Sequence, residues 1–126
     1  MPVTYSTAAK AARMTATRDL IDAGSGFGRI EIGTSLMGTV LAAIPLAKPC
    51  GTVAGAVLTM SGFPKSDTDA DAAGTAVAAR VVDSDGNVII SGLTVGVAAG
   101  DVRVDNLSIA LHQTVTLASA VFTHAA

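Results

Sequence analysis

The chain has 126 residues, a mass of 12.4 kDa and a net charge of -2, and only 14% of its residues are charged. This length predicts a single domain spanning residues 1–126, and half of the residues are hydrophobic, which argues against a disordered chain. The eight lysines and arginines are scattered and aromatic residues make up 3%, so no nucleic-acid partner is expected, because such binders need a concentrated basic face and stacking aromatics.

An N-terminal helix is predicted over residues 7–22. Ser6 or Thr7 can cap its first turn, and the alanines that follow favour helix. Gly24 stands where a left-handed residue commonly ends a helix. Within this single domain, residues 1–24 are therefore expected to form a helix or arm, and residues 25–126 a β-sandwich. Two roles remain open for this helix: an arm that docks on a neighbouring subunit, or a cap on one open end of its own sheet.

Short strands are predicted after the glycine-rich link Gly24–Gly28. In residues 29–32 polar and apolar side chains alternate, which places both isoleucines on one face. Residues 40–46 and 54–61 are short apolar runs typical of strands. Residues 65–74 are polar and predict a solvated loop.

The second half of the chain has the same pattern. Strands are predicted at residues 75–82, 87–91, 93–95, 101–105 and 114–123. Asp85 and Gly86 supply the positive φ that a hairpin turn needs. About seven or eight short strands after one helix indicate a mainly β fold, an antiparallel β-sandwich or a jelly-roll-like barrel.

The apolar content is high for a chain without a membrane segment. The longest apolar stretch, residues 36–47, contains Pro45 and is followed by Lys48, and it is shorter than the roughly 20 residues of a transmembrane helix. No membrane partner and no secretory signal are expected. Cys50 is the only cysteine, so no internal disulfide is possible and nothing indicates an oxidising compartment. The mean hydropathy of +0.56 predicts self-association or docking on a larger assembly.

Two acidic stretches resemble metal loops only superficially. Asp67, Asp69 and Asp71 alternate in the polar loop, but calcium needs six to eight oxygen ligands, and the only glutamate, Glu31, is distant in sequence. Residues 83–86 resemble the start of a calcium loop, but Thr94 stands where the final carboxylate would be. We interpret both stretches as loop or turn and expect no metal site.

Catalytic and cofactor sites are not expected either. The glycines at 24–28 follow a helix and precede a strand, which is the reverse of a dinucleotide-binding loop. Cys50 would need a neighbouring base to act as a nucleophile, and His112 and His124 lie far along the chain without a recognisable motif. No nucleophile elbow, zinc-protease motif or phosphate-binding loop occurs in the sequence.

Several segments resemble a family of small virion proteins of tailed bacteriophages. They span nearly the whole chain, although family members often carry a glycine where His112 stands and an aromatic-containing insert before residue 56. The segments are Thr4–Ala8 with Arg13-Met14 and Ile21, Ile30–Thr34, Val40–Ala42, Asp69–Ala76, Ala79–Val81, Val104–Ile109 and Gln113–Thr116.

The resemblance implies a structural role in the phage particle and no catalytic residues. We therefore expect a non-enzymatic capsid decoration, or cement, protein that is assembled in the host cytoplasm and located in the virion. Its expected partners are the major capsid protein or other virion subunits and further copies of itself, with a trimer favoured. A tail or head–tail connector component is the first alternative. A receptor- or carbohydrate-binding module is the second, although the few aromatic residues make a sugar-stacking face hard to build.

Overall fold

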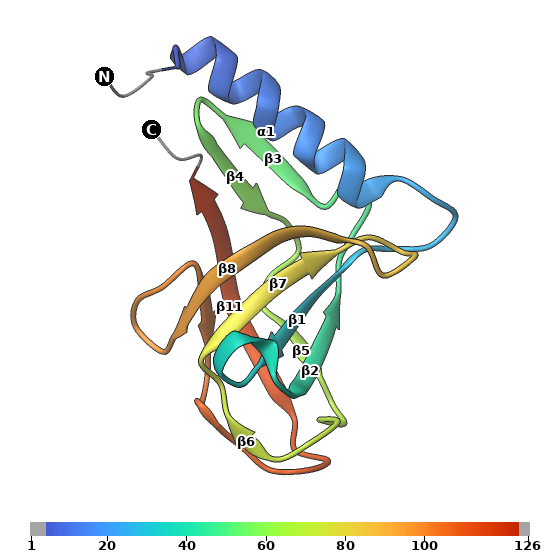
Figure 1. The fold of residues 1–126 in the computed structure, drawn as a ribbon, viewed down its shortest axis with the longest axis vertical. Helices are drawn as coiled ribbons and strands as arrows, with labels where there is room; N and C mark the ends of the chain where they lie inside the picture. Colours follow the sequence, from blue (N-terminus) through green and yellow to red (C-terminus); the bar gives the residue numbers. More distant parts are fainter. Residues whose placement is uncertain (1–4, 124–126) are drawn as a thin grey trace.

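The computed structural model describes residues 5–123, and in this range the chain folds as one N-terminal helix followed by a curled sheet (Figure 1). The prediction of a mainly β fold with one N-terminal helix is confirmed. A short 3-10 turn, η1 (Ser35–Met37), follows the first strand. The remaining elements are α1 (Thr7–Asp22), β1 (Arg29–Gly33), β2 (Val40–Pro45), β3 (Gly51–Ala54), β4 (Val57–Met60), β5 (Lys65–Asp67), β6 (Gly74–Thr75), β7 (Ala78–Val82), β8 (Val88–Gly96), β9 (Val102–Val104), β10 (Ser108–Ile109) and β11 (Val115–Thr123).

The main sheet has the strand order β2-β1-β7-β8-β9-β11-β4-β3 and curls into a half-barrel, with β5 paired to β11. The described residues contain eleven strands rather than seven or eight. One pair, β8 with β9, is parallel, so the sheet is mixed rather than purely antiparallel. The two strands are parallel because residues 97–101 form a loop that returns the chain to the start of a strand running in the same direction as β8. In this loop the Asp101 carboxylate accepts a hydrogen bond from the Thr94 amide at 3.0 Å.

The open side of the half-barrel is bridged by the segment that begins with β5. The Asp67 carboxylate accepts a hydrogen bond from the Ala43 amide at 3.0 Å, and the Asp71 amide donates to the Leu41 carbonyl at 2.7 Å. Both contacts satisfy backbone groups on the outer edge of β2, which would otherwise be free to pair with another chain. The prediction of a solvated loop over residues 65–74 was therefore wrong for β5 and for Ala70, which is buried.

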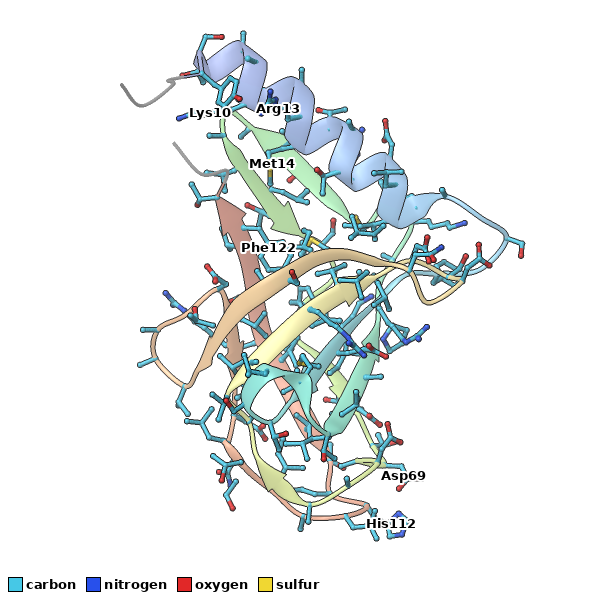
Figure 2. The ribbon with its side chains drawn as sticks, in the orientation of Figure 1. Lys10, Arg13, Met14, Asp69, His112 and Phe122 are labelled. Atoms are coloured by element: carbon cyan, nitrogen blue, oxygen red, sulfur yellow. The ribbon has the colours of Figure 1, made fainter. Side chains whose placement is uncertain are left out.

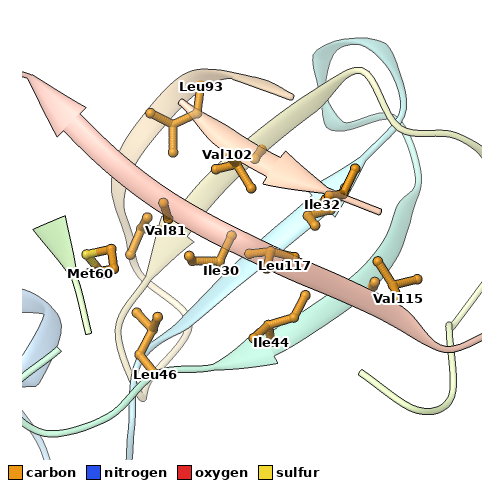
Figure 3. Packing of buried hydrophobic residues seen from close by; sticks show 14 of the residues in the cluster. Ile30, Ile32, Ile44, Leu46, Met60, Val81, Leu93, Val102, Val115 and Leu117 are labelled. Atoms are coloured by element: carbon orange, nitrogen blue, oxygen red, sulfur yellow. The ribbon is translucent and has the colours of Figure 1, made fainter. Parts of the chain in front are cut away.

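The core lies inside the curl of the sheet (Figure 3). The alternation in residues 29–32 puts Ile30 and Ile32 into it, as predicted, since successive strand residues face opposite sides. Val102 and Val104 are buried while Arg103 is exposed, because successive residues of β9 also face opposite sides. Further side chains from other strands complete this core, namely Ile44, Leu58, Val81, Val115 and Leu117.

Helix α1 has the bounds expected from the sequence and packs on its own chain. The Ser6 hydroxyl accepts a hydrogen bond from the Ala9 amide at 3.1 Å and caps the first turn. Met14 and Ile21 are the buried residues of the helix, and Figure 2 shows Met14 pointing from α1 toward the strands. The helix contacts β3 and β4 most closely, so within one subunit it covers this part of the sheet.

Three strand predictions differ from the structure. The strand predicted over residues 75–82 is divided between β6, which pairs with β10, and β7, which belongs to the main sheet. Residues 54–61 do not form one strand, because the chain turns at Gly55, with φ +58°, and makes a β3–β4 hairpin. Residues 88–91 and 93–95 belong to a single strand, β8. Gly92 adopts φ +70° where the register with β7 shifts, between the pairs Ala79–Leu93 and Val81–Ile90. The Asp-Gly turn between β7 and β8 forms as predicted, with the Asp83 amide donating to the Asn87 carbonyl at 3.0 Å.

Candidate interaction surface

A groove of about 390 Å³ lies between η1 and the outer side of β7 and β8. Its lining includes Leu36, Met37, Arg80, Val88 and Gly92. Leu36 is 95% exposed and Val88 is half exposed, so two large apolar side chains border an open groove on the outside of the sheet. Exposed apolar surface of this kind is typical of a contact with another molecule.

Leu36 is held in an unfavourable backbone conformation. The backbone angle φ is +55° at Leu36 and +57° at Met37, and residues other than glycine and asparagine rarely adopt such values. The surrounding turn holds them there, because the Thr34 hydroxyl accepts a hydrogen bond from the Thr39 amide at 2.9 Å. At Gly33 a Cβ atom would lie 2.6 Å from the Thr39 carbonyl oxygen, so this close turn requires glycine. Backbone strain of this kind is concentrated at functional sites, including sites that hold a ligand.

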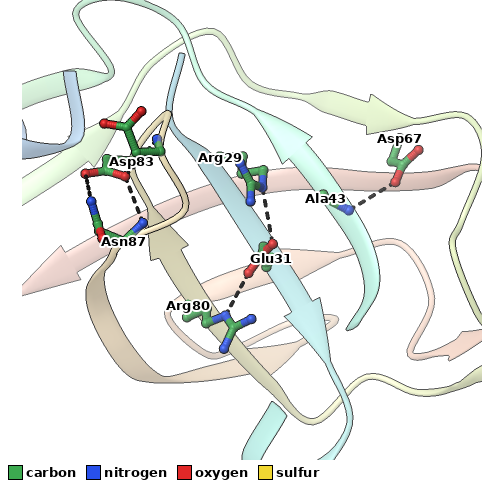
Figure 4. Close-up of polar contacts among 8 residues, drawn as sticks. Arg29, Glu31, Ala43, Asp67, Arg80, Asp83 and Asn87 are labelled. Atoms are coloured by element: carbon green, nitrogen blue, oxygen red, sulfur yellow. Dashed lines mark hydrogen bonds and ion pairs between the residues drawn. The ribbon is translucent and has the colours of Figure 1, made fainter. Parts of the chain in front are cut away.

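A three-residue ion cluster lies beside the groove (Figure 4). Glu31 faces the outer side of β1 but is only 8% exposed, since Arg29 and Arg80 cover it. Its carboxylate accepts one hydrogen bond from Nε of Arg80 at 2.7 Å and one from Nε of Arg29 at 3.2 Å. Burial by itself raises the pKa of Glu31, but the two guanidinium groups outweigh it and hold this pKa below its ordinary value.

The ion cluster carries one excess positive charge. Each arginine bonds to Glu31 through Nε, so the terminal Nη atoms remain available to another acceptor. Arg80 also lines the groove, which therefore combines apolar walls with a cationic border. Such a surface suits a partner that presents an apolar side chain next to an acidic one.

The acidic residues of the polar loop are used by the fold. Asp67 binds the Ala43 amide and also accepts a hydrogen bond from the Asp69 amide at 3.0 Å. Asp69 pairs with His112, and both side chains lie at the end of the molecule opposite α1 (Figure 2). Asp71 is exposed. Within residues 5–123 no three histidine, cysteine, aspartate or glutamate side chains are placed to hold a metal ion.

The turn at residues 83–86 is held by its own carboxylate. The Asp83 side chain accepts hydrogen bonds from the Asn87 amide at 2.8 Å and the Asp85 amide at 3.0 Å. These bonds lower the pKa of Asp83. The arrangement is that of a hairpin turn. The glycine-rich link 24–28 joins α1 to β1, with Gly24 at φ +95° as expected for the end of a helix.

Cys50 is fully buried next to the end of α1. Its backbone amide donates to the Asp22 carboxylate at 3.0 Å. Burial, and then the Asp22 carboxylate, raise the pKa of the Cys50 thiol to about 12, so the thiolate needed for nucleophilic attack is disfavoured. Cys50 lies beside the helix, whereas His112 lies at the far end of the molecule (Figure 2); His124 lies outside the described residues.

Comparison with known proteins adds no relative. No family model, no curated protein and no solved structure matches this chain. Among the described residues, no helix has the length and apolar character needed to cross a membrane. The likeness to phage virion proteins stays a prediction from the sequence.

Sequence reasoning did not identify the groove or the ion cluster. In the sequence, Leu36 only begins an apolar stretch. Glu31 is a polar residue of the alternating segment 29–32 and a glutamate distant from the acidic loop. One signal was available, since Arg29 and Glu31 are two residues apart and share a face of the same strand. Arg80 joins them only because β7 pairs with β1 in a register that places it opposite Glu31.

Proposed function

We propose that this protein is a non-enzymatic structural subunit of a tailed-bacteriophage particle, and specifically a capsid decoration protein that strengthens the mature head. The observation that carries the proposal is the exposed Leu36 beside an open apolar groove on a hydrogen-bonded sheet. A subunit that binds its neighbours in the same way throughout an assembly needs a contact surface of fixed shape, such as this one. The family resemblance noted in the sequence supplies the phage context.

The proposed mechanism is binding to an assembled lattice. A protein that binds the closed shell but not its dispersed subunits stabilises the shell by mass action. The packed core and the bridged edge of the half-barrel hold the contact surface in place, and α1 covers one end of the half-barrel. The partners are the major capsid protein or other virion subunits.

The proposal is tested on particles of the phage whose genome encodes this chain. We expect the protein to remain with particles through density-gradient purification, and gold-labelled antibodies to mark the head. Particles that lack the gene are expected to release DNA at a lower temperature than complete particles. Absence from purified particles would refute a virion role, and labelling confined to the tail would replace decoration by the tail or connector alternative.

A further inference from the structure

The outward face of α1 carries a run of apolar side chains, and Arg13 and Asp19 are the exposed charged residues of the helix. Ala8, Ala12, Ala16 and Leu20 follow one another at four-residue spacing, and all four are exposed. Leu20 is 56% exposed. Surface helices usually carry charged or polar side chains on the face turned to solvent. The buried face of α1, with Met14 and Ile21, is already occupied by the rest of the chain.

One acidic side chain next to this face is available for an intermolecular contact. Of the ten acidic residues, seven accept hydrogen bonds from backbone amides or pair with Arg29, Arg80 or His112: Asp22, Glu31, Asp67, Asp69, Asp83, Asp101 and Asp105. Asp19, Asp71 and Asp85 remain. Asp19 touches only its neighbour Arg18, at 3.4 Å, and it alone of the three adjoins a large exposed apolar residue, Leu20.

We propose that the outward face of α1 in one copy of the chain docks in the groove between η1 and β7–β8 of a second copy. Leu20 would pack against Leu36 and Val88, and Asp19 would approach the free Nη atoms of Arg80. This contact is complementary in charge, since the groove border carries an excess positive charge and the Asp19 carboxylate would exchange its exposed neighbour Arg18 for Arg80. This contact deepens the proposed function, since it rests on the chain being an assembly subunit.

The groove is open where it passes Gly92. A Cβ atom built on Gly92, which lines the groove, would meet no other atom within 4 Å. The alanines of α1 allow its backbone to lie close to this open stretch of β8. The face of α1 and the groove are different surfaces, because α1 lies at one end of the long axis and η1 lies well below it (Figure 1). Contacts between unlike surfaces are head-to-tail and generate rings or filaments.

The first experiment measures self-association of the purified full chain by sedimentation equilibrium. We compare the wild type with Leu20→Asn, with Leu36→Asn, and with the control Leu111→Asn, which changes a leucine about as exposed as Leu20 outside both surfaces. Asparagine tolerates positive φ better than leucine, so Leu36→Asn is expected to keep its thermal stability. Each interface variant is expected to lower the association constant by about tenfold or more, and the control to leave it unchanged.

The second experiment mixes the two interface variants. Leu20→Asn retains an intact groove and Leu36→Asn retains an intact helix face, so an equimolar mixture is expected to form a 1:1 complex that neither variant forms alone. The proposal is overturned if the mixture stays monomeric or if Leu111→Asn weakens association equally. It is also overturned if the wild type is monomeric at every concentration. A monomeric wild type would refute this self-contact but not the virion role, because the virion role is tested independently by the labelling experiment.

Discussion

Replacing Glu31 by glutamine tests whether the ion cluster on β1 and β7 stabilises the fold. The carboxylate has one oxygen for Arg80, at 2.7 Å, and the other for Arg29, at 3.2 Å. Glutamine keeps one acceptor oxygen and places an NH₂ donor against the second guanidinium. The variant therefore loses one charge-assisted hydrogen bond and leaves two positive charges on this face without a counterion.

The expected cost follows from the geometry. A hydrogen bond to a charged group contributes roughly 1.5–3 kcal/mol, and breaking a fully buried ion pair costs about 3–5 kcal/mol. The side chains of Arg80 and Arg29 are 30% and 37% exposed, so water partly compensates them. We expect Glu31→Gln to lower the free energy of unfolding by about 2 kcal/mol, which corresponds to a fall in Tm of about 8 °C for a chain of this length.

The pH dependence of stability provides a second test of the Glu31→Gln prediction, because its direction follows from the pKa of Glu31. The pKa of Glu31 is held below its ordinary value of 4.5 in the folded state. Its stabilising contribution is therefore fully present above pH 4.5 and is lost as the pH falls through the folded-state pKa. The difference between wild type and Glu31→Gln should stay constant from pH 7 to about pH 5 and become smaller at lower pH, as the wild-type carboxyl is protonated.

The assay is urea unfolding followed by circular dichroism, at one low protein concentration for every variant. Asp71→Asn is the matched control, because Asp71 is exposed and its carboxylate is not part of the cluster. The free energy of unfolding of this control should stay within about 0.5 kcal/mol of the wild-type value. If Glu31→Gln is as stable as the control at pH 7, or if its difference from wild type does not shrink in acid, the cluster does not stabilise the fold in the way described.

Three further predictions concern the bridged edge, the thiol and the helix cap. Asp67→Ala removes the acceptor for the Ala43 amide at the edge of β2, and we expect chemical denaturation to show a loss of about 1–2 kcal/mol; no loss would mean that β5 does not hold this edge. Cys50, buried and with its pKa raised to about 12, should resist iodoacetamide at pH 8 in the folded protein and react in urea, as followed by mass spectrometry; equal rates in both states would contradict its burial. Ser6→Ala should cost about 1 kcal/mol and reduce the helical circular dichroism signal by fraying the first turn of α1, and an unchanged signal would show that the cap is dispensable.

Features encoded by neighbouring residues were predictable from the sequence. The bounds of α1 follow from the Ser6 cap and the positive φ of Gly24, and both are local signals. The alternation in residues 29–32 assigned the isoleucines to the core, because a strand turns successive side chains to opposite faces. The Asp-Gly pair at residues 85–86 set the β7–β8 turn for an equally local reason.

The elements that were mispredicted depend on distant partners. Residues 65–67 are polar and have no strand signal, yet they form β5 because β11 offers a free edge about fifty residues later in the chain. Residues 54–61 form a hairpin arm instead of a single strand, since Gly55 and Ala56 give only a weak turn signal and the partner strand β3 precedes them. Strand propensity reflects packing against neighbours, which a single segment does not contain.

The sequence by itself determined the class of the protein: one N-terminal helix, a β-rich body and a high content of apolar residues. The tertiary structure alone decided where that surface lies. Pairing of β7 with β1 brings Arg80 to Glu31, forty-nine residues away, and the close turn at Gly33 turns Leu36 outward beside Val88. The physical reason is that local conformation depends on a few adjacent side chains, whereas a contact surface depends on the register of strands that meet only after folding.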